Sequence, residues 1–536
     1  MLNSPLPLDE LTESLPDVRE RIRRNPSDAA SLHTLGLMLA QRGEYLRSYI
    51  AYRAAAARHP GFLYAAGSAA LTLGRGGDAS AYLEQAIAFN ADHADAWQKR
   101  GELYLDHLRD PQPALDSYLR AIALAPEDSL NYQSAGRCLL NSDPPDAAIA
   151  RLRDSQPPNA DPLHAARGVA IALAESGRYD DAFPIFHDIL RDRPADILSL
   201  RILAEMSDAR RDPKAAQRWY ERAMAAGDDT MATTGFIMHW SKRGDYDRAR
   251  AVFLSKKMGD PGHWRGEAIP GKTLRLVAGD IYFGDALHFV RYARAAKQAG
   301  ANVIVQCPVR LRNLLRTVEG VDATVAPHDP HPPLDFDVSA FWMTYESRIP
   351  VGDLMGGVPY LQAPPELLAG WRKRIVLTKG MCTKGVNAGI AWRGSPFRIR
   401  DPHGSRSMRL EDLRPLTQVP DLTLYSLQCG QGRTELLNAA PPFPAIDLAP
   451  DFPNTAAAIE VLDVVVTIDT SIAHLAGAMG KRTFLILPYD AFFTWMADGD
   501  STPWYPSLTL FRQQTPGDWS GPVKAVARAL GNLKLT

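Results

Sequence analysis

The chain has 536 residues, more than a single hydrophobic core usually serves, so we expect two or three domains. Its 60 Lys and Arg nearly balance 61 Asp and Glu, which argues against the basic excess of a nucleic-acid-binding protein. The four cysteines lie far apart, without the spacing of a zinc site or a disulfide framework, which favours a reducing compartment. Because no signal-peptide pattern and no apolar run of roughly 18 residues occurs, we expect a cytoplasmic protein without a membrane span.

The first half of the chain repeats with a period of about 34 residues. Small, aromatic and proline positions recur at this spacing: Gly36, Tyr52, Ala55 and Pro60; Gly101, Tyr118, Ala121 and Pro126; Ala216, Tyr220 and Ala223. Small residues let two helices cross closely, aromatic rings fill the space between them, and proline ends the second helix. After a lead-in over 1–27, residues 28–257 resemble the tetratricopeptide repeat family. The resemblance implies an all-α solenoid that binds a protein partner, with a plain structural spacer as the alternative.

A linker over 258–271 leads into a segment in which strands alternate with helices, as in a parallel sheet. We expect the following strands: Leu274–Ala278, Ala301–Gln306, Ala388–Trp392, Leu422–Gln428, Val464–Ile468 and Thr483–Leu487. They form two α/β halves, 272–375 and 384–536, with a cleft between them. We expect the final helix, Val523–Leu533, to cross back to the first half.

The clearest candidate site follows the strand Val464–Ile468, which runs directly into Asp469, Thr470 and Ser471 and then a helix containing His474. The start of such a helix offers unpaired N–H groups and the positive end of the helix dipole. A phosphate is the expected ligand there.

A second candidate site lies at the start of the first α/β half, where Gly284-Asp285 opens a helix and His288 follows one turn later. An aspartate at a helix start is commonly a capping residue, and a single histidine is commonly a core or surface residue. The residues alone therefore do not decide between these structural roles and a functional site.

The order of these motifs resembles the heptosyltransferase-type glycosyltransferases of family 9, which have the GT-B fold of two Rossmann-like halves. The resemblance covers roughly residues 270–520 and includes Gly389-Ile-Ala-Trp-Arg-Gly-Ser395, Arg406-Ser-Met-Arg and Tyr425-Ser-Leu-Gln. It implies an inverting transferase that needs no metal and no cofactor beyond a nucleotide-sugar co-substrate.

The resemblance also implies roles for single residues. Asp285 would be the general base, with His288 beside it on the same helix face. Thr470 and Ser471 would bind the nucleotide phosphate, with His474 nearby. Three further donor-side residues are Arg406, where the family often has a phosphate-binding lysine, Ser395, and Asp469, which would hold the loop in shape.

Three features qualify this interpretation. Tyr282 and Phe283 replace a smaller, polar approach to Asp285 that is frequent in the family, so acceptor recognition would differ or the cleft would be inactive. Asp335-Phe-Asp337 imitates a metal-binding motif, but its position favours a strand end. The cationic loop with Arg398, Arg400 and His403 fits a solvated surface and a phosphate-binding cleft equally well.

Three functions remain open at this stage. The first is a glycosyltransferase whose repeats select a protein acceptor, with flagellin as one candidate implied by the resemblance. The second keeps the transferase but takes a lipid-linked envelope glycan as acceptor. The third is a non-catalytic repeat scaffold with a decayed transferase domain.

Overall fold

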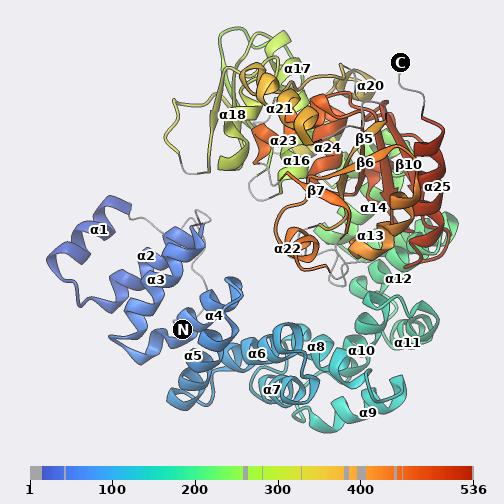
Figure 1. Cartoon of the computed structure of the whole chain (residues 1–536). Coiled ribbons are helices and arrows are strands. Elements are labelled where there is room, and N and C mark those ends of the chain that lie inside the picture. Colours follow the sequence, from blue (N-terminus) through green and yellow to red (C-terminus); the bar gives the residue numbers. More distant parts are fainter. Residues whose placement is uncertain are drawn as a thin grey trace. The chain divides into compact units, whose positions relative to one another are not determined.

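The computed structural model describes residues 15–41, 44–256, 264–279, 282–327, 329–355, 357–378, 385–394, 406–439, 443–448 and 451–533. The chain divides into two compact units, residues 1–203 and 204–536 (Figure 1). The division falls inside helix α12 (Ile197–Ala209), because the helices that follow pack mainly with the C-terminal part of the chain.

The first unit is built from consecutive helix pairs that follow helix α1 (Leu15–Arg24). The pairs are α2 (Ala29–Gln41) with α3 (Tyr45–Ala56), α4 (Leu63–Thr72) with α5 (Gly76–Phe89), α6 (Ala94–Glu102) with α7 (Pro111–Leu124), α8 (Ser129–Leu139) with α9 (Pro145–Ser155), and α10 (Leu163–Glu175) with α11 (Tyr179–Asp192). This arrangement is a tetratricopeptide-like solenoid, as the sequence period predicted.

Small residues let the two helices of a pair approach closely. A Cβ added to Gly36 would lie 2.6 Å from the ring of Tyr52, and one added to Gly101 would lie 2.7 Å from the ring of Tyr118. Each aromatic ring therefore occupies the space that a larger residue on the facing helix would need. The repeat positions identified in the sequence are thus the positions at which the helices cross.

The second unit begins with three further helices, α13 (Pro213–Ala226), α14 (Thr230–Ser241) and α15 (Tyr246–Ser255). They continue the repeat pattern, but their other surfaces pack against the α/β part of the chain. The ring of Phe253 lies 5.5 Å from that of Trp342, and the hydroxyl groups of Ser241 and Tyr345 are hydrogen-bonded at 2.9 Å.

The first α/β half contains a parallel sheet in the order β3-β2-β1-β4. Its strands are β1 (Thr273–Val277), β2 (Asn302–Gln306), β3 (Ala323–Val325) and β4 (Phe336–Ser339). The helical segments are α16 (Phe283–Phe289), α17 (Ala293–Gln298), α18 (Arg312–Leu315), α19 (Ala340–Glu346), α20 (Val351–Met355) and α21 (Pro365–Thr378).

The second half contains a six-stranded parallel sheet in the order β10-β9-β8-β5-β6-β7. Its strands are β5 (Val386–Ala391), β6 (Leu422–Ser426), β7 (Ala445–Asp447), β8 (Val464–Ile468), β9 (Thr483–Leu487) and β10 (Leu508–Arg512). Its helical segments include η6 (Leu410–Gln418), α22 (Gln431–Leu437), α23 (Phe452–Val461), α24 (Ser471–Ala478) and α25 (Ser520–Gly531). Counted within this half, the strand order is that of a doubly wound parallel sheet.

One expectation for the α/β part is wrong. The final helix α25 does not cross back to the first half; it packs on η6, β9 and β10 of its own half. Val523, Val526 and Leu530 are buried there with the side chains of the second sheet, because they form an apolar stripe at helical spacing.

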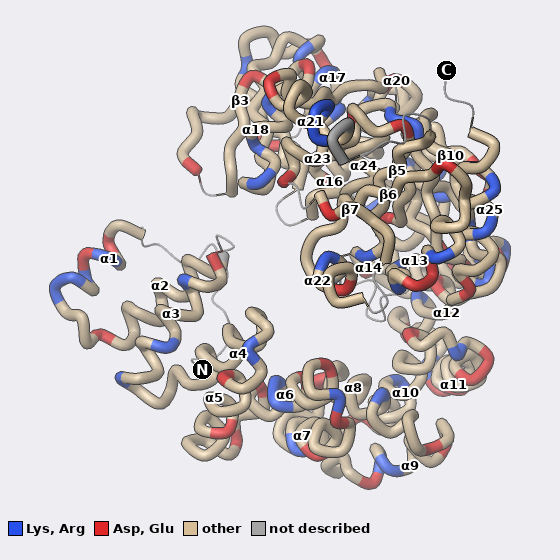
Figure 2. The backbone as a smooth tube through the Cα atoms, viewed as in Figure 1, with Lys and Arg blue, Asp and Glu red and all other residues tan. Residues whose placement is uncertain are grey.

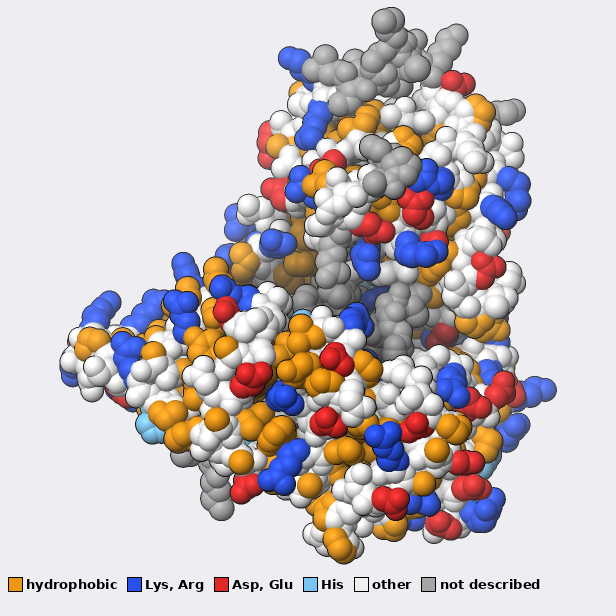
Figure 3. Space-filling model, turned by 60° about the horizontal axis from the view of Figure 1, so that its bottom comes forward, with side chains coloured by type: hydrophobic (Ala, Val, Ile, Leu, Met, Phe, Trp, Pro, Cys, Tyr) orange, Lys and Arg blue, Asp and Glu red, His pale blue; other side chains and the backbone are white. Residues whose placement is uncertain are grey.

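Charged residues of both signs occur along both units (Figure 2). On the face shown in Figure 3, hydrophobic side chains are interspersed with charged ones. None of the helices within the described ranges has the length and apolarity that crossing a bilayer requires.

Candidate functional site

The strand order of the second sheet defines where a ligand is expected. Strand β5 lies between β6 and β8. After β5, the chain first forms β6 and β7 on one side of it and then returns to form β8, β9 and β10 on the other side. In such sheets, ligands bind at the carboxyl ends of the two strands that flank this switch point. The switch point brings the residues after β5, Trp392 to Gly394, beside the residues after β8, Asp469 to Ser471.

Arg406 and Asp469 meet at this edge, although 63 residues separate them. Nη1 of Arg406 donates to Oδ2 of Asp469 at 3.2 Å and to its carbonyl oxygen at 3.4 Å. The side chains are only 12% and 3% exposed, respectively, so the pair is largely withdrawn from water. Asp469 thereby orients Arg406 at this edge. The loop-holding role expected of Asp469 stays a prediction.

Thr470 is the N-cap residue of α24. Its Oγ1 accepts a hydrogen bond from the backbone N–H of Ile472 at 3.3 Å and lies 3.3 Å from Oγ1 of Thr467. Gly394 lies close by, because a Cβ added to it would be 3.8 Å from Cγ2 of Thr470. Ser471 follows as the first residue of α24, so the predicted phosphate-binding turn is a capped helix start facing the loop after β5.

Two residues that the sequence did not single out as site residues hold the loop after β5. Oε1 of Gln428 accepts hydrogen bonds from the backbone N–H groups of Trp392 and Arg393, both at 2.9 Å. Oε2 of Glu435 accepts from Nε1 of Trp392 at 3.0 Å and from Nη1 of Arg393 at 3.2 Å. The sequence signal was weak, since Gln428 appeared only as the last residue of the motif that begins at Tyr425.

Asp285 lies in the first turn of α16, which follows β1 at the carboxyl edge of the first sheet. Its side chain is partly exposed. Gly284 packs against His474 of the second half, because a Cβ added to Gly284 would lie 2.9 Å from Cδ2 of that ring. Helices α16 and α24 therefore meet, which brings the predicted base and the predicted phosphate-binding turn to the same region of the second unit.

The two predicted histidines are buried between the halves and share one partner. Nδ1 of His288 lies 2.9 Å from the hydroxyl of Tyr505, and Nδ1 of His474 lies 3.0 Å from the same hydroxyl. Burial, together with the charge of Arg291 and the neighbouring His474, holds the pKa of His288 well below its usual value. His288 is thus neutral and 1% exposed, which favours a positioning role over direct contact with a substrate.

Arg291 completes this buried cluster. Its guanidinium donates to the carbonyl oxygens of Trp504 at 3.1 Å and Met355 at 3.2 Å, and to the hydroxyl of Tyr360 at 3.1 Å. The same group lies 4.8 Å from the centre of the Tyr505 ring. A buried charge with this many partners fixes the side chains around it.

Other predicted residues lie away from this site or outside the described part of the chain. Ser395, Arg398, Arg400 and His403 lie outside the described residues. Asp335 pairs with Lys272 at 2.9 Å, and Asp337 pairs with Arg275, so both carboxylates hold cations of the protein itself. Within the described ranges, no group of three or more His, Cys, Asp or Glu side chains is placed to hold a metal ion.

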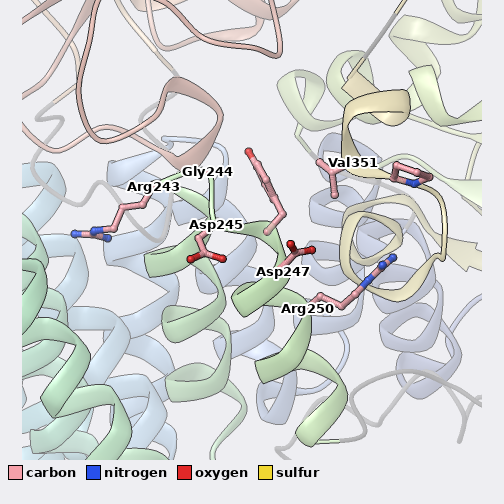
Figure 4. Close-up of a pocket in the computed structure, with 8 residues that line it drawn as sticks. Arg243, Gly244, Asp245, Asp247, Arg250 and Val351 are labelled. Atoms are coloured by element: carbon pink, nitrogen blue, oxygen red, sulfur yellow. The ribbon is translucent and has the colours of Figure 1, made fainter.

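A hollow of about 520 Å³ lies beside the first turn of α15 (Figure 4). Arg243, Asp245, Asp247 and Arg250 line it with charges of both signs, and Val351 of α20 lies opposite them. Its remaining lining includes Tyr246, whose hydroxyl accepts a hydrogen bond from Nε1 of Trp504 at 3.0 Å. The hollow is separate from the switch point. Trp504 contacts both Tyr246, which lines the hollow, and Arg291 of the buried cluster.

Known proteins resemble parts of the chain. No protein-family model matches it. Protein FlbA of Caulobacter vibrioides is 23% identical over 302 residues, 50% of this chain and 48% of that protein, so the chain spans about half the length of this relative.

Among solved structures, a tetratricopeptide repeat protein from Parabacteroides merdae is 18% identical, with 46% of this chain and 86% of that chain covered and a TM-score of 0.30. PilF of Pseudomonas aeruginosa is 18% identical, with 45% and 95% covered and a TM-score of 0.25. The assignment of the helical repeats rests on the helix pairs described above.

Proposed function

We propose that the protein is a glycosyltransferase that takes a sugar from a nucleotide-sugar donor and transfers it to a protein acceptor selected by the helical repeats. The observation that carries this proposal is the group formed by Arg406, Asp469 and Thr470 at the switch point of the second sheet. The family resemblance of the sequence supplies the reaction class.

The donor half offers two features that suit a diphosphate. The first N–H groups of α24 lack acceptors within the helix and lie at the positive end of its dipole. At the same edge, the guanidinium of Arg406 is held by the carboxylate of Asp469 and provides further N–H donors. Gly394 itself puts no side chain beside Thr470, where an added Cβ would lie 3.8 Å from Cγ2, and this favours the approach of a phosphate oxygen to the turn.

On the acceptor side, Asp285 is the proposed base. Its carboxylate takes the proton from an acceptor hydroxyl while that oxygen forms a bond to the anomeric carbon. The bond between the anomeric carbon and the phosphate oxygen breaks, and the nucleotide leaves with the bonding electrons and the negative charge. Because the attack comes from the opposite face, the configuration of the sugar is inverted.

The proposed acceptor is a protein because helical repeats form extended binding surfaces for other chains. Flagellin is the first acceptor to test, on the strength of the family resemblance alone. A lipid-linked envelope glycan is the alternative acceptor and is tested in parallel in the same transfer experiment.

Donor binding is tested by titrating the full chain with nucleoside diphosphates and nucleotide sugars in a calorimeter. Arg406→Ala should weaken binding of the preferred nucleotide at least about tenfold, because a charge-assisted contact is lost. Arg414→Ala is the matched control, since Arg414 forms an exposed pair with Glu411 at 2.6 Å and should leave binding unchanged. If no nucleotide binds the wild type at millimolar concentration, the proposal fails and the non-catalytic scaffold is the better description.

Transfer is tested by mass spectrometry of the acceptor after incubation with the donor that binds. Asp285→Asn should bind the donor as the wild type does but lose most of the transfer rate, because an amide cannot accept the proton. A sugar added to flagellin supports the protein acceptor, whereas a sugar added only to a lipid-linked glycan supports the alternative. Equal rates for Asp285→Asn and the wild type would remove Asp285 from the mechanism.

A further inference from the structure

One hydroxyl joins the two α/β halves at the candidate site. The hydroxyl of Tyr505 lies 2.9 Å from Nδ1 of His288 on α16 and 3.0 Å from Nδ1 of His474 on α24. All three side chains are buried, and Tyr505 is fully enclosed. The ring of Tyr505 is itself fixed, because a Cβ added to Gly477 of α24 would lie 2.5 Å from Cδ1 of that ring.

The number of protons at this contact is limited. A tyrosine hydroxyl carries one proton, and a neutral imidazole carries a proton on only one of its two nitrogens. Burial is the largest cause that raises the pKa of Tyr505 well above its usual value, so the hydroxyl keeps its proton. If the hydroxyl donates a hydrogen bond to one imidazole, its oxygen must accept a hydrogen bond from the N–H of the other imidazole. The two histidines then have opposite tautomers.

A competing acceptor for the Tyr505 proton is more distant. The hydroxyl of Tyr360 lies 3.5 Å from that of Tyr505, which is longer than either imidazole contact. Tyr360 donates its own proton to the carbonyl oxygen of Leu287 at 2.8 Å and accepts a hydrogen bond from Arg291 at 3.1 Å. The shorter contacts therefore favour donation from Tyr505 to a histidine.

The helices that carry these histidines also carry the proposed reacting groups. Asp285 lies one turn before His288 on α16, and Thr470 and Ser471 begin the helix that contains His474. The ring of His474 lies directly against Gly284, the residue that precedes Asp285. Helix α16 has only seven residues, so contacts with neighbouring elements, rather than its own length, determine its orientation.

We propose that Tyr505 is a positioning residue of the transferase cleft: its hydroxyl holds His288 and His474 as opposite tautomers and so fixes Asp285 relative to the phosphate-binding turn. The role rests on the proposed function, but the hydrogen-bond arrangement does not. Loss of the hydroxyl leaves two buried imidazole nitrogens without this partner, and α16 and α24 can then shift against each other. A misplacement of about 1 Å is enough to reduce a transfer rate by about a hundredfold.

The hydrogen-bond arrangement is tested by long-range proton–nitrogen correlation spectra of full-length protein labelled with ¹⁵N-histidine. His288→Gln and His474→Gln assign the two signals. We expect one ring with its proton on Nδ1 and the other with its proton on Nε2, and we expect both signals to change in Tyr505→Phe. If both rings carry their proton on Nδ1, the Tyr505 hydroxyl accepts from both histidines and must donate to Tyr360 instead, and the proposed arrangement is overturned.

The positioning role is tested by comparing Tyr505→Phe with Tyr292→Phe. Tyr292 is a matched control because it is also fully buried, but its hydroxyl contacts Thr344 at 2.6 Å within the first half. Tyr505→Phe should lower kcat about ten- to a hundredfold with little change in the KM for the donor. Tyr292→Phe should leave both parameters within about twofold. A kcat for Tyr505→Phe equal to that of the control would overturn the role.

The two proposals fail in different ways. A wild-type protein that transfers no sugar would remove the proposed function. The claim that Tyr505 fixes α16 relative to α24 would then be tested by amide hydrogen exchange of Tyr505→Phe and Tyr292→Phe. Tyr505→Phe must speed exchange in residues 283–289 and 471–478 together, and more than Tyr292→Phe does; equal exchange in the two variants would overturn the claim.

Discussion

Gly284 and His474 lie so close together that a Cβ on the glycine would be 2.9 Å from Cδ2 of the imidazole. The imidazole has little freedom to move, because its Nδ1 is 3.0 Å from the hydroxyl of the buried Tyr505. Absence of a side chain at position 284 is therefore what allows the start of α16 to meet α24. This contact determines how near the proposed base can come to the proposed donor-phosphate turn.

Substitution of Gly284 by alanine tests this close approach. The added methyl group must displace His474 or α16, so we expect the free energy of unfolding to fall by about 1–3 kcal/mol. The transfer rate should fall as well, because Asp285 moves with α16. Gly370→Ala is the control: Gly370 is an exposed helical position with no atom within 4 Å of an added Cβ, so this variant should be as stable as the wild type or more so. Equal stability of Gly284→Ala would contradict the close contact.

Acid should weaken the second unit through His288. Burial is the largest cause that lowers the pKa of this histidine in the folded protein, whereas in the unfolded chain its pKa is about 6.5. Below about pH 6.5, His288 is protonated in the unfolded chain but stays neutral in the folded protein. The free energy of unfolding therefore falls as the pH falls below this value and is fully regained above it. The contribution is at most about 1.4 kcal/mol per pH unit.

Urea unfolding between pH 5 and 8 measures this contribution. His288→Gln is the comparison, because glutamine keeps hydrogen-bonding atoms but does not titrate in this range. The difference between wild type and variant removes the effect of other titrating groups, such as His33, whose pKa burial also lowers. A difference that stays constant across the range would show that His288 does not titrate between the two states as expected.

A buried ion cluster in the first helices of the second unit should be important for its stability. Oδ1 of Asp208 lies 2.9 Å from Nδ1 of His239 and accepts a hydrogen bond from Nη2 of Arg243 at 2.8 Å. Asp208→Ala should lower the free energy of unfolding by about 1–3 kcal/mol, because the buried His239 and the partly exposed guanidinium of Arg243 both lose their partner. Glu411→Ala removes the partner of Arg414 at an exposed pair and should leave the denaturation midpoint unchanged.

Metal independence is a separate prediction. Lys272 and the backbone N–H of Thr273 both donate to Asp335, at 2.9 Å and 2.8 Å, and Arg275 pairs with Asp337. We therefore expect a chelator to leave donor binding and transfer unchanged, and Asp337→Asn to retain both. Loss of activity with the chelator, restored by a divalent cation, would contradict this prediction.

The elements that the sequence predicted well are those with long, buried apolar runs. Strands β8 and β9 have the predicted bounds, because all ten of their residues are buried between helices and no polar face interrupts the pattern. Strands β3, β7 and β10 were not identified from the sequence. Strands β3 and β7 have only three residues each, too few to show a period. Short strands of this kind depend on their neighbours in the sheet more than on their own residues.

The site was predictable where residues belong to one strand–helix junction and less so where partners are distant. Asp469, Thr470 and Ser471 follow directly from the end of β8 and the start of α24. Nothing local to His288 indicates that its partner is Tyr505, 217 residues further along the chain. Likewise, the repeat period continues through Phe253 and gives no sign that this ring also packs against Trp342 of the α/β part.

Those contacts make a prediction about which part of the chain folds alone. Helices α14 and α15 contact the first half through Tyr345 and Trp342, and the second half through the hydrogen bond between Tyr246 and Trp504 and the ion pair between Lys242 and Asp490 at 2.6 Å. A fragment of residues 197–536 should therefore unfold in one cooperative transition.

A fragment of residues 264–536 has the whole α/β part but lacks these helices. It exposes the surfaces of Trp342, Tyr345 and Trp504 that α14 and α15 cover, and it leaves the indole N–H of Trp504 without its acceptor. We expect this shorter fragment to have a lower melting temperature than the longer one, with a broad transition, because apolar contacts and a buried hydrogen bond are both lost. Differential scanning calorimetry of the two fragments decides the question. Equal melting temperatures would mean that the last repeat helices are attached to the α/β part without stabilising it.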